Sequence, residues 1–467
     1  MSQDNIVEVL REYYRDPAIR KRIREFLGGS EYRGPSAVYL VGNDGFHEFG
    51  DPASLSSLPE YLDSGLEIER SLWDRDSLVA DIDIEYENFD APASAWQDPA
   101  RAFALQQPVL DAALRILRRF GIVPLSLLSG RGFHLVWAIS RSSAAFHRLV
   151  RIGRVPPSLA VRYKQPGGVG IELGRSFAGL GLILEFIGHR VFASAASASQ
   201  VPIKLASIEV GPGAHGREIV AFDLSEYGDP LETRHMRAPF SAYLKPKRFE
   251  WALGKSGIAQ VLPIFTIPLV DGISAGDALP IARNPQRTAE LAQGCAAFIP
   301  DASAAMDALM NEYEASSLAA FHNEFYAEPW REGEVSAKIC RATTLDAPKC
   351  VVNLLESPND GLLKPAALQH VVRTLMALGR RPREIARVIY AAYRQDCGWG
   401  TMWSRLDPFN RAIFYTRLFA GLVNTGVDRL IDFNCVSHKE KGYCTIPDCS
   451  SNLATFRDVL QGWRTAH

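Results

Sequence analysis

The fold is decided by one stretch of sequence, Val79-Ala80-Asp81-Ile82-Asp83-Ile84-Glu85. Apolar and acidic residues alternate in it, and alternate side chains of a β-strand point to opposite faces of a sheet. The stretch therefore predicts a strand with a buried apolar face and a second face that carries Asp81 and Asp83, roughly 6–7 Å apart along the backbone. Two such carboxylates suit Mg²⁺ or Mn²⁺ in one- or two-metal sites, although a solvated acidic face of a surface strand has the same pattern.

A second stretch follows downstream, Leu127-Leu128-Ser129-Gly130-Arg131-Gly132-Phe133-His134-Leu135-Val136-Trp137. The glycines on both sides of Arg131 predict a tight turn where the backbone can approach a ligand closely. The planar guanidinium of Arg131 suits phosphate oxygens, and His134 enters the apolar strand that follows. By itself, this stretch is equally consistent with a hairpin turn that carries a chance arginine and a histidine of the hydrophobic core.

The third element is an apolar run that ends in an acid and is followed by a basic segment. The run is Ile219-Val220-Ala221-Phe222-Asp223, and residues 233–245 read Thr-Arg-His-Met-Arg-Ala-Pro-Phe-Ser-Ala-Tyr-Leu-Lys. In this order, the three elements resemble the archaeo-eukaryotic primase superfamily, which includes primase catalytic subunits and primase-polymerases. Its members carry an Asp-x-Asp strand, a Ser-Gly-Arg-Gly-x-His segment, and a third acid before an Arg-x-x-Arg-x-Pro-x-Ser-x-x-x-Lys segment. The resemblance covers residues 39–245.

This resemblance implies roles for individual residues. Asp81, Asp83 and Asp223 would be the catalytic acids and would hold the Mg²⁺ or Mn²⁺ ions. The residues that would bind the nucleotide are Ser129, Arg131, His134, Arg237 and Lys245. Glu172 competes with Asp223 for the third acidic position, but only Asp223 precedes the basic segment. The implied fold is of the α+β class, with an antiparallel or mixed sheet flanked by helices.

Pattern breaks divide the 467 residues into three parts. Residues 1–250 are expected to form the catalytic domain, with a helix pair split near Pro17 and a long helix over residues 99–120. Proline-rich turns predict a linker and helical connector over residues 251–335. The mostly helical pattern of residues 336–467 predicts an all-α C-terminal domain.

Composition limits the class of protein further. Lys and Arg (51) nearly balance Asp and Glu (53), so any basic surface for nucleic acid must be local. Basic residues gather at residues 380–394 and 245–248, and either group is equally consistent with a solvated helix face. No apolar run reaches the length of a membrane-spanning helix, and the N-terminal residues lack a signal-peptide pattern. We therefore expect a cytoplasmic protein without membrane association.

All seven cysteines lie in the C-terminal part, from Cys295 onward. Without a secretory signal, an intracellular metal site is favoured over disulfides, and no Cys-x-x-Cys pair indicates a zinc ribbon or finger. One cysteine early and three late in this part resemble the iron–sulfur domain of the primase large subunit. This resemblance implies a [4Fe–4S] cluster, with Zn²⁺ or unliganded cysteines as the alternatives. Its ligands would be Cys350, Cys435, Cys444 and Cys449, with Cys340, Cys397 and, for zinc, His438 in reserve.

Together, these resemblances imply a DNA primase or primase-polymerase. Such a nucleotidyltransferase makes or extends primers from NTPs or dNTPs by template-dependent, two-metal phosphoryl transfer. Its partners would be single-stranded DNA template, primer and nucleoside triphosphates. The alternatives are a gap-filling repair polymerase of the same superfamily and a catalytically inactive protein that binds nucleic acid.

Overall fold

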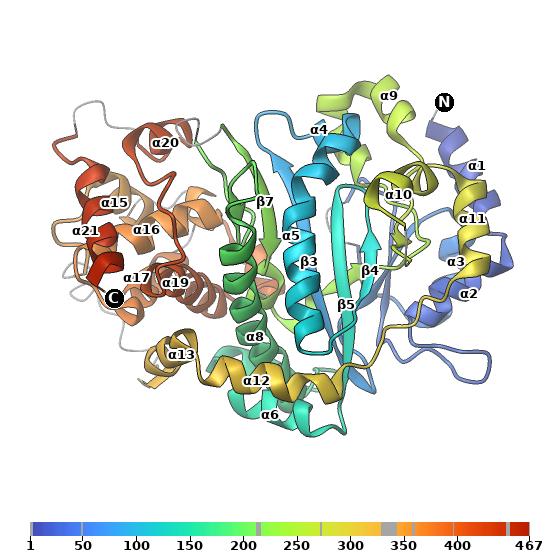
Figure 1. Cartoon of the computed structure of the whole chain (residues 1–467), viewed down its shortest axis with the longest axis horizontal. Helices are drawn as coiled ribbons and strands as arrows, with labels where there is room; N and C mark the ends of the chain where they lie inside the picture. Colours follow the sequence, from blue (N-terminus) through green and yellow to red (C-terminus); the bar gives the residue numbers. More distant parts are fainter. Residues whose placement is uncertain are drawn as a thin grey trace.

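Two β-sheets form the centre of the N-terminal part of the molecule, and helices surround them (Figure 1). The computed structural model describes residues 3–47, 50–211, 216–270, 273–327, 343–356, 360–395, 397–444 and 449–466. Helix accounts for 56% of the structure and strand for 13%. The α+β class and the helical C-terminal region are therefore confirmed.

β3 is a central strand of the larger sheet. This six-stranded sheet has the order β6-β7-β3-β5-β4-β9, and its neighbouring strands are antiparallel except β6 and β7. The three-stranded sheet is antiparallel, in the order β1-β2-β8. The strands are β1 (Leu40–Asn43), β2 (Glu67–Ser71), β3 (Ser77–Asn88), β4 (Leu125–Leu128), β5 (Gly132–Ser140), β6 (Ile203–Lys204), β7 (Glu218–Asp223), β8 (His235–Arg237) and β9 (Ile267–Pro268).

Helices precede, cover and follow the two sheets. The helices up to residue 327 are α1 (Gln3–Tyr13), α2 (Pro17–Phe26), α3 (Leu58–Asp63), α4 (Ser94–Gln97), α5 (Pro99–Arg119), α6 (Ala144–Ile152), α7 (Pro157–Lys164), α8 (Ile171–Ala195), α9 (Glu250–Val261), α10 (Ala275–Ala282), α11 (Pro285–Gly294), α12 (Met306–Glu314) and α13 (Ser317–Ala327). The C-terminal helices are α15 (Lys349–Glu356), α16 (Pro365–Ala377), α17 (Pro382–Tyr393), α18 (Gly400–Arg405), α19 (Pro408–Asn424), α20 (Cys435–Glu440) and α21 (Leu453–Ala466). Short 3₁₀ helices include η3 (Ser225–Gly228), η4 (Leu231–Thr233) and η5 (Lys245–Phe249).

One face of the six-stranded sheet is covered by α5 and α8 (Figure 1). Ile82 and Ile84 of β3 are fully buried. Phe222 of β7 lies against Gly188 of α8, where an added Cβ would stand 3.3 Å from the ring. Because side chains alternate along a strand, the acidic residues next to these apolar ones point to the other face, toward the three-stranded sheet.

α8 is the one helix of the described residues that is long and apolar enough, by length and composition, to cross a membrane. Counting uninterrupted apolar residues overlooked it, because Gly, Ser, Glu, His and Arg interrupt its apolar sequence. In the structure, 78% of its most apolar window is buried. α8 is thus packed as a core helix of this fold.

The segment that follows the smaller sheet differs from the predicted linker. β9 pairs with β4 through Leu127 and Pro268, and Phe265 pairs with Ala242. Prolines indicated a linker here, but a strand at the edge of a sheet tolerates proline because its outer N–H groups need no partner. These residues therefore belong to the sheet, while the predicted division into three domains stays a prediction.

A first buried ionic network joins α8 to the C-terminal helices. The Glu185 carboxylate of α8 lies 2.9 Å from the Arg417 guanidinium of α19 and 3.2 Å from His322 Nε2 of α13. Although burial acts in the opposite direction, Arg417 and His322 lower the pKa of Glu185 to about 2. The ionised carboxylate is therefore the form that holds these three helices together.

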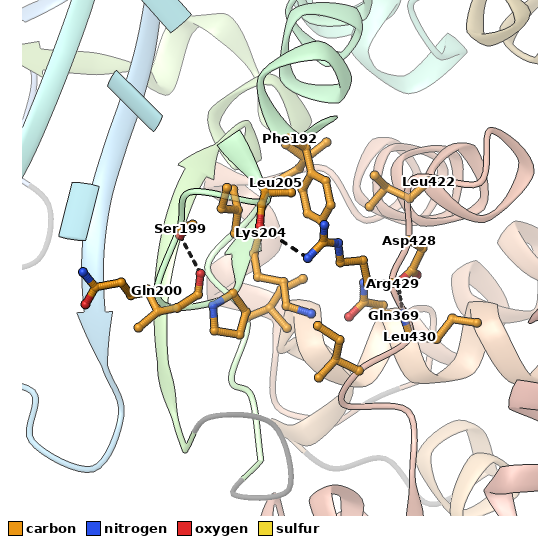
Figure 2. Close-up of a pocket in the computed structure, with 16 residues that line it drawn as sticks. Phe192, Ser199, Gln200, Lys204, Leu205, Gln369, Leu422, Asp428, Arg429 and Leu430 are labelled. Carbon is orange, nitrogen blue, oxygen red and sulfur yellow. Dashed lines mark hydrogen bonds between the residues drawn. The ribbon is translucent and has the colours of Figure 1, made fainter. Parts of the chain in front are cut away.

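A second network joins the C-terminal helices to the sheet edge at β6. Asp432 accepts from Lys204 of β6 at 3.1 Å, from Arg373 of α16 at 3.1 Å and from Lys441 at 3.0 Å. Figure 2 shows the pocket beside it, where Lys204 and Leu205 on one side meet Gln369 and Arg429 on the other. The two parts of the chain therefore form a continuous, ion-paired junction.

Glu185→Gln is expected to destabilise the folded protein by about 3 kcal/mol at pH 7, because it leaves Arg417 buried without its charge partner. The folded-state pKa of Glu185 is below its ordinary value of 4.5. Its contribution is therefore present above pH 4.5 and is lost as the pH falls toward 2. Denaturant unfolding of both proteins across this range measures the difference. A difference that stays constant with pH would contradict the ionic role.

Candidate active site

Strand register brings three of the predicted residues to one place. Asp83 on β3 pairs directly with His134 on β5 and with Asp223 on β7. Directly paired residues of antiparallel strands present their side chains on the same face. These three side chains and Asp81 line a cavity of about 210 Å³, the carboxylate pocket, between the two sheets.

The pocket takes its walls from both sheets. The rest of the lining comes from β3, from the three-stranded sheet and from the segments after β7 and β8: Glu85, Glu69, Ser225, Glu226, Arg234, His235, Met236, Arg237, Tyr243, Lys245 and Arg248. It therefore combines a floor of carboxylates with a rim of cations, as a site for polyphosphate and divalent cations requires.

His134 contacts the acidic pair. Its Nδ1 lies 3.1 Å from Asp81 Oδ2 and 3.9 Å from Asp83 Oδ1, and its side chain is 12% exposed. Burial lowers the pKa of His134, but Asp81 and Asp83 together raise it to about 10. The ring is therefore an imidazolium at neutral pH, and the alternative of a histidine in the hydrophobic core is wrong.

Several carboxylate oxygens of the pocket are buried without a hydrogen-bond partner in the described part of the chain. They are Asp81 Oδ1, Asp83 Oδ1 and Glu226 Oε1. Burial and the neighbouring Glu85 raise the pKa of Asp83, and Asp81 and Asp223 add to this effect. Oxygens that lack donors, in a site with excess negative charge, fit a divalent cation chemically.

The side chains are not oriented around a cation. Among the residues that the structure describes, no three His, Cys, Asp or Glu side chains converge to hold one metal ion. Asp81 Oδ2 is engaged by His134 instead. Binding of a cation therefore requires rotation of carboxylates that already share the pocket.

Glu226 is a carboxylate that the sequence reasoning missed. It lies in η3, three residues after Asp223, and lines the pocket. Burial and the proximity of Asp81 raise its pKa. An acid just beyond the end of a strand was the available signal, but only the structure shows that the chain turns back here and presents Glu226 to the same pocket.

Three of the predicted phosphate-binding cations are paired with glutamates. Arg237 donates to Glu67 through Nε at 2.7 Å, and its guanidinium lies 4.4 Å from the centre of the Tyr243 ring. Lys245 Nζ lies 3.8 Å from Glu85. Arg131 is ion-paired with the same glutamate and lies beside the pocket rather than in its lining.

Two further predictions concern Ser129 and Glu172. The Ser129 hydroxyl donates to the Gly132 carbonyl at 3.1 Å and is buried, so it closes the turn around Arg131 instead of facing the pocket. Glu172 lies in the first turn of α8 and is exposed. Since it lies outside the sheet, the competing assignment of Glu172 as the third acid is wrong.

The four cysteines singled out from the sequence converge. Cys350, Cys435, Cys444 and Cys449 line one cavity of about 90 Å³, the cysteine pocket, together with His438. Burial and the other three thiols raise the pKa of Cys350 to about 12. His370 Nε2 lies 3.3 Å from Cys350 Sγ.

The one reserve cysteine among the described residues, Cys397, does not belong to this lining. Cys397 Sγ contacts the Gln395 carbonyl at 3.3 Å, and the cysteine pocket does not include it. Cys340 lies outside the described residues. Cys295 follows α11, in the N-terminal part of the fold. Among the described cysteines, only the four predicted ones therefore line the cysteine pocket.

Comparison of the chain with models of known protein families, with curated proteins and with solved structures found no match in any of the three. The functional argument accordingly rests on the chemistry and geometry of the residues themselves.

Proposed function

We propose that this protein is a template-dependent nucleotidyltransferase of the primase or primase-polymerase type. The observation that carries the proposal is the joint placement of Asp81, Asp83, Asp223 and His134 on three adjacent strands of one sheet. This placement matches the three elements that resemble the superfamily. They are a strand with two carboxylates, a partner strand with a histidine, and a third acid at the end of the next strand.

The carboxylates would hold Mg²⁺ or Mn²⁺, and their buried, unpartnered oxygens support this assignment. When bound, these cations neutralise triphosphate charge and favour in-line attack by a 3′-hydroxyl. Arg237 and Lys245 would exchange Glu67 and Glu85 for phosphate oxygens. Because those glutamates keep the cations in place beforehand, little ordering of side chains remains for nucleotide binding.

His134→Asn is expected to weaken nucleotide binding by about 10- to 100-fold, since a hydrogen bond from a charged donor to phosphate contributes about 1.5–3 kcal/mol. Stabilisation by Mg²⁺ should persist, because His134 is a cation and not a metal ligand in this assignment. Nucleotide titrations followed by thermal shift measure both effects. The control is His147→Asn, at an exposed position of α6. Unchanged nucleotide affinity would remove His134 from the site.

The cysteine pocket would hold a [4Fe–4S] cluster, which supplies structural cross-linking and, in principle, redox chemistry. Four thiols around one small cavity fit such a group. Ligands of a single zinc ion all lie about 2.3 Å from it, and the described side chains form no such group. The described side chains of the carboxylate pocket show no such convergence either, so it is the resemblance to the primase large-subunit domain that favours the cluster over zinc.

Incorporation of labelled nucleotides opposite homopolymeric templates tests the proposed activity. We expect the nucleotide complementary to each template to be incorporated, with Mg²⁺ or Mn²⁺ required. Incorporation only at short gaps would favour the repair polymerase. Binding of DNA without incorporation, under any of these conditions, would favour the inactive nucleic-acid-binding protein.

A further inference from the structure

Positive charge is concentrated between β5 and the start of α8. Residues 141–175 contain seven basic residues and one acidic residue, in a chain with a net charge of −2. Two of the seven are paired with glutamates: Arg148 with Glu314 and Arg162 with Glu232. In the described part of the chain, the remaining basic residues have no such glutamate partner.

Four of these cations are exposed: Arg151, Arg154, Lys164 and Arg175. No carboxylate of the described residues pairs with any of them. Arg151 donates to the His147 carbonyl at 3.3 Å, and Arg154 donates to the Arg151 carbonyl at 2.6 Å. Backbone carbonyls hold the two guanidinium groups in place without neutralising their charge, which leaves them available to an anion.

Two close contacts bring together the segments that carry the four cations. A Cβ on Gly153 would stand 1.9 Å from the Arg175 carbonyl oxygen, so the end of α6 lies directly on α8. A Cβ on Gly174 would stand 2.2 Å from the Tyr163 ring, so the end of α7 lies there too. The residues next to these contacts are the four cations, and we call this region the α6–α8 cationic surface.

The cationic surface borders a hollow lined by residues of α6, α8, α12 and α13 and by Arg154. In Figure 1, α6 and α12 lie at the lower edge of the molecule. The hollow measures about 500 Å³ and is lined by Arg148, Arg151 and Arg154 on one side and by Asn323 and Tyr326 of α13 on the other. The lining also includes apolar side chains, such as Leu182, and Glu314, whose charge is paired with Arg148. Val161 is the one large hydrophobic side chain of residues 141–175 that is prominently exposed.

The same helices are bonded to the segment that carries the catalytic acids. The Tyr163 hydroxyl accepts from the Leu231 amide at 3.0 Å. The Tyr227 ring lies 4.9 Å from Phe177 of α8, and its hydroxyl donates to the Asp81 carbonyl at 2.8 Å. These contacts connect α7 and α8 to the segment after β7 and to the strand that carries Asp81.

We propose that the α6–α8 cationic surface binds the phosphodiester backbone of the single-stranded template. This inference rests on the proposed function, because it is the polymerase activity that requires a template beside the acids. Unpaired Lys and Arg side chains bind phosphates without reading sequence and release counterions when they do so. An anionic membrane surface is the competing partner, but it would favour exposed apolar side chains among the cations.

The test uses the full-length protein with a combined variant, Arg151→Ala, Arg154→Ala, Lys164→Ala and Arg175→Ala. Fluorescence anisotropy of a labelled oligothymidylate, measured from low to high salt, gives affinity and salt dependence. Each phosphate contact with a single strand contributes about 0.7 to the slope of log K against log salt. We therefore expect the slope to fall by about 3 and affinity near 0.1 M salt to fall by about 10²- to 10³-fold.

A matched control removes four exposed cations from other parts of the chain: Arg11→Ala, Lys255→Ala, Arg287→Ala and Lys364→Ala. Its affinity should stay within about threefold of the wild type, because only net charge has changed and exposed charges are screened by salt. Thermal unfolding and the Mg²⁺-dependent thermal shift should be unchanged in both variants, since neither touches the carboxylate pocket.

Wild-type affinity of the combined variant for oligothymidylate would overturn the inference, as would an equal loss in the control. A loss of binding only to vesicles that contain phosphatidylserine would overturn it in favour of a membrane. These outcomes are separate from the proposed activity. If the wild type binds DNA through this surface but incorporates no nucleotide, the polymerase proposal fails; if it polymerises while the variant binds normally, only the surface is wrong.

Discussion

Asp83→Asn is expected to reduce nucleotide incorporation by about 10³-fold or more, which corresponds to about 4 kcal/mol of lost transition-state stabilisation. Asp83 is central among the acids, because it pairs with both His134 and Asp223 across the sheet. The amide keeps the shape of the side chain and removes the charge that would bind the cations. Steady-state incorporation on a primed template measures the effect. The control is Asp111→Asn, at an exposed position of α5.

The same substitution is expected to stabilise the fold when divalent cations are removed. Burial and neighbouring acids raise the pKa of Asp83 above 3.8. The carboxyl group of Asp83 therefore costs stability at neutral pH, and this cost vanishes as the pH falls to 3.8 and below. Thermal unfolding in EDTA should give a higher Tm for the variant at pH 7 and equal values in acid. Mg²⁺ should raise the Tm of the wild type only. Near-wild-type incorporation by the variant would contradict the metal assignment.

Cys435→Ser is expected to abolish the metal centre of the C-terminal helices. Anaerobically purified wild type should be brown, with about four iron and four sulfide per chain, as this cluster type requires. The variant should be colourless. Since metal binding contributes folding free energy locally, unfolding of the C-terminal part should move down by about 10 °C or more. Initiation should suffer more than extension of a ready-made primer, which needs mainly the sheet.

The matched control is Cys295→Ser, because Cys295 lies outside the cysteine pocket. It should retain colour, iron and both activities. Colourless wild-type protein with one zinc per chain would contradict the cluster but keep the ligands. Wild-type protein without any metal after anaerobic purification would show that the four thiols are simply buried.

The acids that form the floor of the carboxylate pocket could be predicted almost completely from the sequence. Alternation around Asp81 and Asp83 predicted both the strand and the direction of the acids, since period-two patterning is a local property. The expectation that Asp223 joins them came from the resemblance, since only this acid precedes the basic segment, and β7 does pair with β3 at this residue. The convergence of Cys350 with three cysteines more than 80 residues away followed from resemblance, not from any local pattern.

The remaining features depend on contacts between distant segments. The turn at η3 places Glu226 in the lining of the pocket. Glu67 and Glu85 form ion pairs with Arg237 and Lys245, the predicted phosphate-binding cations. Neither relation has a sequence period that could have revealed it. The cationic surface was missed because its members are spread over three helices and become neighbours only where glycines allow close packing. The prolines near β9 indicated a linker, but a strand at the edge of a sheet tolerates proline.

Synthesis of primers on circular single-stranded DNA, from nucleotides alone, tests the central claim most directly. The wild type with Mg²⁺ or Mn²⁺, supplied in turn with NTPs and dNTPs, is expected to produce short strands that begin with a 5′-triphosphate and are complementary to the template. The Asp81→Asn and Asp83→Asn double variant is expected to produce none. Absence of product from the wild type with every nucleotide and metal, or equal product from the double variant, would contradict the assignment of this pocket to primer synthesis.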